Sequence, residues 1–380
     1  MSLEFEANVR DLSHKGLGVV DHPNGKVYFV EGVWPGDIAV FKIISEKKNF
    51  GFAKLVQLKK ESFFRVSARC PHQGFESGKC GGCSWMIADY LAQVHYKQKR
   101  VMQQLSRAGL LDNNVVVNPM IHSEQKTGYR NRAQFKTDGS VLGYVSSDNQ
   151  SIAKINDCLI LTKKNRDTLT KLLKKLPNKK WKAIHKENWS TLDIDEDINV
   201  NQVLVNKRSS FQQANYRQNQ NMKRWVYEKL SKLDKKQSVT ELFSGSGNFT
   251  QEISKLDFKS VIALEGSKVC VDKLNKKSLK NVTSHCIDIN NEKRWSKIEN
   301  LDGTGILFLD PPREGFEQID SFVAKQKSLS TIIYISCNLD TFCKDVKSIC
   351  GNDKWKLSEV QPIDMFPQTP HVELMSVIVK

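Results

Sequence analysis

The sequence predicts an α/β protein in which a mostly parallel, doubly wound sheet follows a small β-barrel and a small α+β domain. Three observations support this. From about residue 209, strand-like runs alternate with helical patterns, which is typical of a parallel sheet with helices on both faces. Residues 4–59 contain short apolar runs broken by turn signals, as in a small barrel. Because 380 residues exceed one typical domain, we place the domains at residues 1–60, 61–208 and 209–380.

The N-terminal region predicts about five strands, in the runs LEFEANV, LGVV, KVYFVEGV, IAVFKII and GFAKLVQL. Pro-Asn-Gly and Pro-Gly-Asp turns separate some of these runs. Five short strands with basic residues on them favour an OB-type barrel, a fold that often binds oligonucleotides. A scaffold barrel without a ligand is the alternative.

The middle region is less regular. A cysteine-rich loop leads into a helical pattern over residues 84–109, and strand-like pieces follow at 129–137 and 140–146. Segment 162–189 then holds ten basic residues against two acids, with two tryptophans among them, a pattern typical of a nucleic-acid-binding surface. We select as candidate nucleic-acid contacts four lysines of this segment and two arginines before it: Lys174, Lys175, Lys179, Lys180, Arg130 and Arg132.

Composition restricts the class of protein. Lysine and arginine outnumber aspartate and glutamate by 58 to 42, giving a formal charge of +16 that favours a polyanionic partner, although lysine richness for solubility gives the same total. The first residues are charged throughout and no run of about 18 apolar residues occurs, so we expect neither a signal peptide nor a membrane span. Nine cysteines are too sparse for a disulfide scaffold and indicate a reducing compartment. We expect a cytoplasmic monomer.

A glycine turn follows the first strand of the C-terminal region. Gly245 and Gly247 let the backbone pass close to a ligand, but Thr250 stands where a dinucleotide-binding fingerprint has its third glycine or alanine. A nucleoside cofactor without phosphates needs only the close turn and a carboxylate after the next strand for its ribose. Glu265 meets that need, and Asp288 follows the third strand, suited to an adenine amino group. Together these residues favour S-adenosylmethionine.

Two further strands end in chemically capable residues. Asp310 begins an Asp-Pro-Pro loop, and Arg313 stands where amine-directed methyltransferases have an aromatic, which argues against N-methylation. Cys337 follows the next strand, where a thiolate suits methylation at C5 of a pyrimidine, because its addition at C6 makes C5 nucleophilic. Glu373 starts the last strand and is the candidate base for the C5 proton.

A cysteine cluster lies in the middle region. Its candidate ligands include a Cys-x2-Cys pair and fit either zinc or an iron–sulfur cluster: Cys70, Cys80, Cys83 and Cys158. Cys270, Cys286, Cys343 and Cys350 lack such spacing and are interpreted as core or surface thiols.

In chain order, the motifs FQQAN, ELFSGSGNFT, LDPPREG, SCN and PHVE resemble those of the RNA 5-methyluridine methyltransferases, and the barrel resembles their TRAM domain. The chain is similar to the iron–sulfur-bearing 23S ribosomal RNA uracil-C5 type. One position departs from the family, since Leu339 follows Ser-Cys-Asn where proline is usual. The resemblance implies a 4Fe-4S cluster, Cys337 as nucleophile, Glu373 as base and Asp310 near the uracil. It also implies a set of residues around the cofactor or active site: Phe211, Gln213, Phe243, Gly245, Gly247, Glu265, Asp288 and Asp310.

The resulting hypothesis is an S-adenosylmethionine-dependent methyltransferase acting on uridine C5 in RNA, with 23S ribosomal RNA favoured as substrate. Transfer RNA is the alternative substrate. A non-catalytic RNA-binding protein and a metal-sensing regulator are alternatives of other classes, but the complete set of Cys337, Glu373 and the glycine turn argues against the first. No helix-turn-helix pattern supports the second.

Overall fold

The computed structural model describes residues 4–183, 187–207, 211–298, 301–351 and 354–380. These residues form two compact units. The first unit comprises residues 1–97, 125–209 and 366–370, and the second comprises residues 98–124, 210–365 and 371–380. The predicted domain boundary at residues 208 and 209 lies outside the described residues, so the three-domain division stays a prediction.

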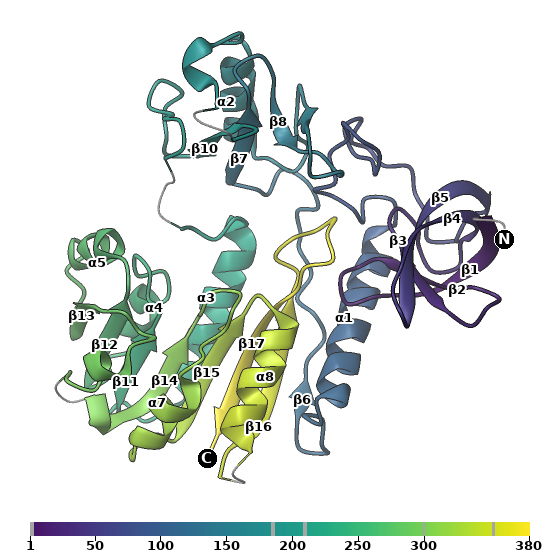
Figure 1. Cartoon of the computed structure of the whole chain (residues 1–380). Coiled ribbons are helices and arrows are strands. Elements are labelled where there is room, and N and C mark those ends of the chain that lie inside the picture. Colours follow the sequence, from purple (N-terminus) through teal and green to yellow (C-terminus); the bar gives the residue numbers. More distant parts are fainter. Residues whose placement is uncertain (1–3, 184–186, 208–210, 299–300, 352–353) are drawn as a thin grey trace. The chain divides into compact units, whose positions relative to one another are not determined.

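A closed five-stranded barrel forms the start of the first unit, which confirms the prediction for this region (Figure 1). Alternate residues of its strands fill the interior, including the fully buried Tyr28 and Phe41. The strands pair in the order β1-β2-β3-β5-β4. Their bounds are β1 (Glu4–Leu12), β2 (Gly18–Asp21), β3 (Val27–Val30), β4 (Ile38–Glu46) and β5 (Phe50–Lys60).

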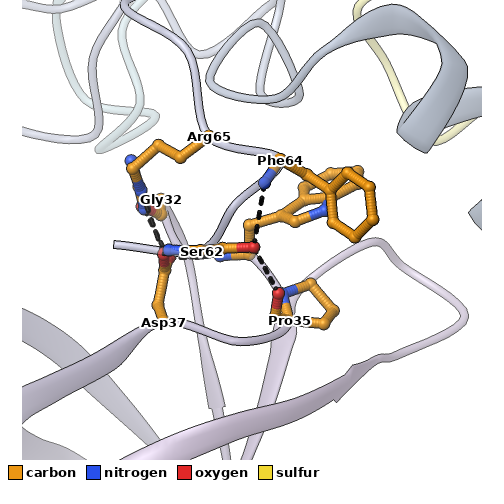
Figure 2. A network of polar contacts seen from close by, with 7 residues as sticks. Gly32, Pro35, Asp37, Ser62, Phe64 and Arg65 are labelled. Carbon is orange, nitrogen blue, oxygen red and sulfur yellow. Dashed lines mark hydrogen bonds and ion pairs between the residues drawn. The ribbon is translucent and has the colours of Figure 1, made fainter. Parts of the chain in front are cut away.

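A buried ion pair fixes the chain where it leaves the barrel (Figure 2). Asp37, with a side chain that is 0% exposed, accepts hydrogen bonds from the backbone N–H of Ser62 at 2.8 Å and from the Arg65 guanidinium at 2.6 Å. Arg65 also donates to the carbonyl of Gly32, and the Ser62 hydroxyl donates to that of Pro35. Removing one partner of such a pair leaves a buried charge, at a cost of roughly 3–5 kcal/mol. The segment after β5 is therefore held firmly against the loop between β3 and β4.

The rest of the first unit contains a four-stranded sheet with a helix packed on it. The sheet core includes Phe135, Leu169 and Trp181. The order β10-β7-β8-β9 joins β7 (Arg132–Thr137), β8 (Leu142–Val145), β9 (Ile152–Lys154) and β10 (Ser190–Asp195), with α2 (Lys163–Leu173) and the 3₁₀ helix η1 (Lys179–Trp181) nearby in the chain.

The predicted helix at residues 84–109 is shorter in the structure. It is α1 (Tyr90–Arg107), and the Asp89 carboxylate accepts the backbone N–H groups of Leu91 and Ala92 at its start. Such a cap satisfies N–H groups that have no partner within the helix. The apolar residues before Asp89 form a turn whose side chains are buried, which explains why they continued the apolar pattern.

The second unit is built on an eight-stranded sheet of order β13-β12-β11-β14-β15-β17-β16-β6 (Figure 1). This confirms the predicted α/β fold. β14 and β15 are buried at every residue, as expected for central strands covered on both faces. The strands are β6 (Val116–Val117), β11 (Ser238–Leu242), β12 (Ser260–Glu265), β13 (Val282–Cys286), β14 (Thr304–Leu309), β15 (Thr331–Ser336), β16 (Lys356–Ile363) and β17 (Glu373–Val379). The helices are α3 (Tyr216–Ser231), α4 (Thr250–Ser254), α5 (Lys268–Asn275), α6 (Glu292–Trp295), η2 (Leu301–Gly303), α7 (Ile319–Lys325) and α8 (Leu339–Cys350).

Strand direction decides which residues meet. β11, β12, β13, β14 and β15 are parallel, so their carboxyl ends share one edge of the sheet. β17 is antiparallel to β15, so its first residue lies at that same edge. In open α/β sheets, ligands bind at the carboxyl edge. In the part of the chain that the structure describes, no helix is both long and apolar enough to cross a membrane.

Candidate active site

Cys337 lies at the carboxyl edge of the sheet, directly after β15. β15 and β17 are antiparallel, and their register pairs Ser336 with Leu374. Cys337 follows Ser336 and Glu373 precedes Leu374, so Cys337 and Glu373 lie opposite each other. Asp310 follows β14, the other neighbour of β15, at the same edge. The structure thus brings together the three residues that the sequence selected for the reaction.

The neighbours of Cys337 fix its turn. The Ser336 hydroxyl donates to the carbonyl of Asn338 at 3.0 Å and accepts the Asn338 N–H at 3.2 Å. The Asn338 side-chain oxygen accepts the Asp340 N–H at 3.0 Å and caps α8. Proline at the position of Leu339 would suit the first turn of this helix, but the Asn338 cap defines the helix start without it.

The loop after Asp310 is tied to the turn that carries Cys337. The carbonyl of Arg313 accepts a hydrogen bond from the Asn338 side-chain amide at 3.0 Å and another from the Thr341 hydroxyl at 3.1 Å. These contacts explain the asparagine of the Ser-Cys-Asn motif, because its amide joins the two loops of the candidate site.

A second set of hydrogen bonds connects α8 to β15 and to the loop after Asp310. Asp345 of α8 accepts the Phe316 N–H at 3.0 Å and the Tyr334 hydroxyl at 2.7 Å. Gly315, with a φ of 78°, passes so close that a Cβ there would lie 2.5 Å from the Asp345 carboxylate. This glycine is therefore required by both its backbone conformation and its contact.

The acidic groups of the candidate site repel one another in a buried environment. Burial raises the pKa of Cys337 to about 12, and the charges of Glu373 and Asp310 add to this shift. Burial raises the pKa of Glu373 to about 8, with Asp310 adding to the shift and Arg313 opposing it. Burial raises the pKa of Asp310 to about 7. Near neutral pH the thiol is protonated, so it must lose its proton as the substrate binds in order to act as a nucleophile.

The glycine turn has the geometry that the sequence predicted. Gly245 and Gly247 have φ values of 54° and 84°, and a Cβ on Gly247 would lie 2.5 Å from Leu274. The Glu265 carboxylate accepts the N–H of Gly245 at 2.9 Å with one oxygen and that of Ser267 at 2.8 Å with the other. Each oxygen keeps a further lone pair for a hydroxyl of a ligand.

Glu241 in β11 is a buried acid that the sequence reasoning did not select. It is 1% exposed, and burial raises its pKa to about 8, with the charge of Asp310 adding to the shift. Its Oε2 atom and the hydroxyl of Ser244 are buried without a hydrogen-bond partner within the described ranges. The available signal was an acid inside an apolar strand immediately before a glycine turn.

The remaining candidates for the cofactor region differ in exposure and in the elements that carry them. Asp288 is exposed, two residues after β13, at the carboxyl edge. Phe243 directly follows β11 and has a φ of 59°. Its ring centroid lies 5.6 Å from that of Phe316. Gln213 is partly buried ahead of α3, whereas the side chain of Phe211 is 71% exposed.

The four cysteines selected as ligands line one pocket that is partly open to solvent. Burial raises the pKa of Cys80, Cys83 and Cys158, and the neighbouring thiols add to each shift. Cys70, Cys83, Cys158 and Phe366 pack against a buried cluster formed by Met86, Tyr129 and Ile160. Across the described ranges, no group of three or more His, Cys, Asp or Glu residues is arranged to hold one metal ion.

The predicted nucleic-acid contacts differ in exposure: the four lysines Lys174, Lys175, Lys179 and Lys180 are exposed. Arg132 instead forms a largely buried ion pair with Asp193 at 2.6 Å. Arg130 donates to the carbonyl of Arg132 at 2.9 Å, and its charge opposes the raised pKa of the Cys80 thiol. Trp181 is 7% exposed within the sheet core, so the first of the two tryptophans does not belong to a stacking surface.

Comparison with known proteins identifies the family. The profile of the tRNA (uracil-5-)-methyltransferase family matches residues 179–380, more than half of the chain. The chain belongs to this family. The TRAM domain profile matches residues 4–56, which covers most of the barrel. An uncharacterized RNA methyltransferase of Nitrosomonas europaea is 39% identical over 98% of this chain and 96% of its own length.

Two better-described proteins are similar over nearly their whole length. The 23S rRNA (uracil(1939)-C(5))-methyltransferase RlmD of Legionella pneumophila is 26% identical over 98% of this chain and 97% of its own. The Pyrococcus abyssi tRNA (uracil-54, C5)-methyltransferase, solved with S-adenosyl-L-homocysteine, has a TM-score of 0.71 at 20% identity, over 99% of this chain and 100% of that one. This uracil-5-methyltransferase family member is an RNA (uracil-C5) methyltransferase, and its methyl donor is S-adenosylmethionine.

Proposed function

We propose that this enzyme methylates C5 of a uridine in 23S ribosomal RNA through a covalent bond between Cys337 and C6 of the base. The observation that carries the proposal is the position of Cys337, opposite Glu373 and beside Asp310 at one edge of the sheet. Uridine C5 is a poor nucleophile, and a neighbouring thiolate remedies this by adding to C6.

The chain's own residues supply the nucleophile and the base. The Cys337 thiol releases its proton to solvent and its sulfur bonds to C6, which moves the electron pair of the C5–C6 double bond onto C5 and the adjoining C4 carbonyl. S-adenosylmethionine supplies the electrophilic methyl group that C5 takes, and it leaves as S-adenosylhomocysteine. Glu373 then removes the C5 proton, the double bond forms again and the sulfur leaves C6. We assign to Asp310, whose pKa burial raises to about 7, a hydrogen bond to the uracil.

Residues around the glycine turn fit the cofactor. Gly245 and Gly247 allow close approach, and Glu265 has free lone pairs for the ribose hydroxyls. Ser244 and Glu241 keep buried oxygen atoms without partners in the described part of the chain, as expected where a polar ligand completes the hydrogen bonding. We assign adenine recognition to Asp288. Phe211, Gln213 and Phe243 stay predicted neighbours of the cofactor or the substrate. The side chain of Phe211 is exposed and therefore accessible to a bound molecule.

The choice of ribosomal RNA follows the similarity to RlmD, and transfer RNA is the second candidate because the similar Pyrococcus abyssi enzyme has that substrate. The two are distinguished by mapping 5-methyluridine in ribosomal and transfer RNA from cells with and without the gene. We expect one 23S position to lose the modification. Loss confined to transfer RNA would contradict the ribosomal assignment, and loss from neither RNA would contradict the function. We further propose that the enzyme acts as a cytoplasmic monomer.

For RNA binding we propose the exposed lysines of the basic segment. Lys174 and Lys175 follow α2, and Lys179 and Lys180 lie in η1. Arg132 is held by Asp193 in a largely buried ion pair, and the charge of Arg130 acts on the Cys80 thiol, so we propose both only as secondary contacts. Because phosphate contacts release counterions, neutralising the four lysines together should flatten the salt dependence of RNA binding.

For the cysteine pocket we propose a 4Fe-4S cluster held by four thiolates: Cys70, Cys80, Cys83 and Cys158. A zinc ion needs all four sulfurs about 2.3 Å from one point, whereas a four-iron cluster takes one sulfur at each iron and spreads them around a cavity. Four thiols around one pocket support the second choice. Methyl transfer to uridine involves no electron transfer, so the cluster's role is to hold together the segments that supply the cysteines, three of which pack against Met86, Tyr129 and Ile160.

The cluster is tested by replacing Cys80 with serine. The wild-type protein, purified without oxygen, should be brown and contain about four irons per chain, while the variant should lose iron and unfold at lower denaturant concentration, because ligand binding energy is also folding energy. Cys270→Ser, outside the pocket, is the matched control and should keep both properties. A colourless wild-type protein with one zinc per chain would contradict the assignment.

A further inference from the structure

Three phenylalanines form a continuous aromatic surface across two barrel strands. The ring centroids of Phe29 and Phe50 lie 5.7 Å apart, those of Phe29 and Phe52 6.0 Å, and those of Phe50 and Phe52 5.8 Å. β3 and β5 are parallel neighbours, and their register pairs Phe29 with Phe52. Each ring therefore contacts both others, and we call these three residues the phenylalanine face.

The phenylalanine face points away from the barrel core. Tyr28, Val30 and Ala53 alternate with it along the same strands and are buried in the interior, which is complete without the three rings. Phe50 is 37% exposed, and Phe29 and Phe52 are partly buried, each with its ring next to the other two. Packing of the barrel thus does not explain why aromatic residues occupy these outward positions. An exposed apolar cluster of this kind marks a binding surface.

Lysines surround the phenylalanine face. Lys47 and Lys48 lie in the hairpin that leads to Phe50, and Lys54 shares the outer side of β5 with Phe50 and Phe52 by strand alternation. Lys42 pairs with Lys54 across β4 and β5. Among the residues that the structure describes, these four lysines form no ion pair. The acid of the hairpin, Glu46, is already engaged by the Tyr28 hydroxyl and by Lys26. Two further acids lie beside these lysines: Glu4 is opposite Lys42 across β1 and β4, and the exposed Glu31 follows β3 next to Lys54. The four lysines outnumber these two acids, so the surface combines partly exposed rings with an excess of positive charge.

We infer that the phenylalanine face binds an unpaired stretch of the substrate RNA, with bases stacked on the rings and phosphates near the four lysines. This inference rests on the proposed RNA substrate and extends it to a second contact region on β3 and β5. Aromatic side chains stack on any base, whereas positive charge next to them selects a polyanion over an apolar protein partner. Bases within a duplex are covered by their neighbours, so the site favours single strands.

The test uses the full-length protein and a fluorescent oligouridylate of about 12 nucleotides, within the site size of an OB fold. Phe50→Ala should weaken binding about tenfold, the lower part of the range for loss of one base stack, and leave the salt dependence of binding unchanged. Lys47→Gln combined with Lys48→Gln should instead reduce that salt dependence, since only the lysines release counterions from phosphates.

Three controls keep the result interpretable. Val56→Ala, at a 46% exposed apolar residue of β5 outside the ring cluster, should bind as the wild type does, and Phe50→Trp should retain affinity because it retains a stacking ring. Duplex RNA should not distinguish Phe50→Ala from the wild type. Unchanged oligouridylate affinity in Phe50→Ala, or equal loss with duplex RNA, would overturn the inference while leaving uridine methylation intact. Failure of the wild type to form 5-methyluridine, with Phe50-dependent binding preserved, would overturn the proposed function alone.

Discussion

Replacement of Cys337 by alanine is expected to abolish methyl transfer to RNA, by at least about 10⁴-fold, the scale seen when a covalent nucleophile is removed. Without the sulfur, no bond to C6 forms and C5 never becomes nucleophilic. The measurement follows labelled methyl groups from S-adenosylmethionine into RNA. Binding of S-adenosylhomocysteine should persist, because the glycine turn lies on a different strand.

Cys343 provides the matched control. Burial raises the pKa of both Cys337 and Cys343 to about 12, so titration does not distinguish the two thiols. Position does: Cys343 is buried on α8, whereas Cys337 opens onto the edge that carries Glu373. Cys343→Ala should therefore keep its activity. An inactive Cys343→Ala beside an active Cys337→Ala would show that the other thiol is the nucleophile.

Replacement of Glu373 by glutamine is expected to trap the enzyme on its RNA. The amide cannot accept the C5 proton, so addition and methylation proceed but the sulfur is not released. A protein–RNA band that survives denaturing electrophoresis should appear only with S-adenosylmethionine, and the Cys337→Ala, Glu373→Gln double variant should form none. In the wild type, release should accelerate as pH rises through about 8, the pKa to which burial raises Glu373, because its charged form is the base.

Glu314 is the matched control for this variant. It is an exposed acid in the loop after Asp310, and Glu314→Gln should turn over without an accumulated adduct. Full turnover by Glu373→Gln would remove Glu373 from the role of base. Absence of any trapped species from an inactive Glu373→Gln would mean that the residue acts before methylation.

The sequence was sufficient for the fold and for the edge at which the site lies. Alternating strand and helix patterns predict a parallel sheet, and Asp310 and Cys337 each follow an apolar run that ends at its carboxyl edge. The position of Glu373 depends on β17 being antiparallel to β15, which local periodicity does not determine. Its selection came from the chemistry of C5 methylation, which requires a base.

Local sequence patterns do not predict which residues pair when they lie far apart in the chain. The basic segment suggested that its arginine neighbours and tryptophans were free for nucleic acid, but Arg132 is paired with Asp193, 61 residues away in the chain, and Trp181 fills a core. Glu241 was overlooked because an acid in a strand normally marks an exposed face, and here the strand is central. The apolar pattern also did not predict where α1 begins. The helix starts after Asp89, because the carboxylate of that residue accepts N–H groups of the first turn, and not at residue 84, where the apolar pattern begins.

The most direct test of the account is release of hydrogen from C5. Substrate RNA carrying tritium at C5 of uridine is incubated with the purified enzyme and S-adenosylmethionine, and tritium in water is compared with methyl groups in RNA. Because methylation at C5 replaces that hydrogen, the account predicts equal amounts of both, and neither with Cys337→Ala. Methyl transfer without tritium release would place the methyl group elsewhere and contradict uridine C5 as the target.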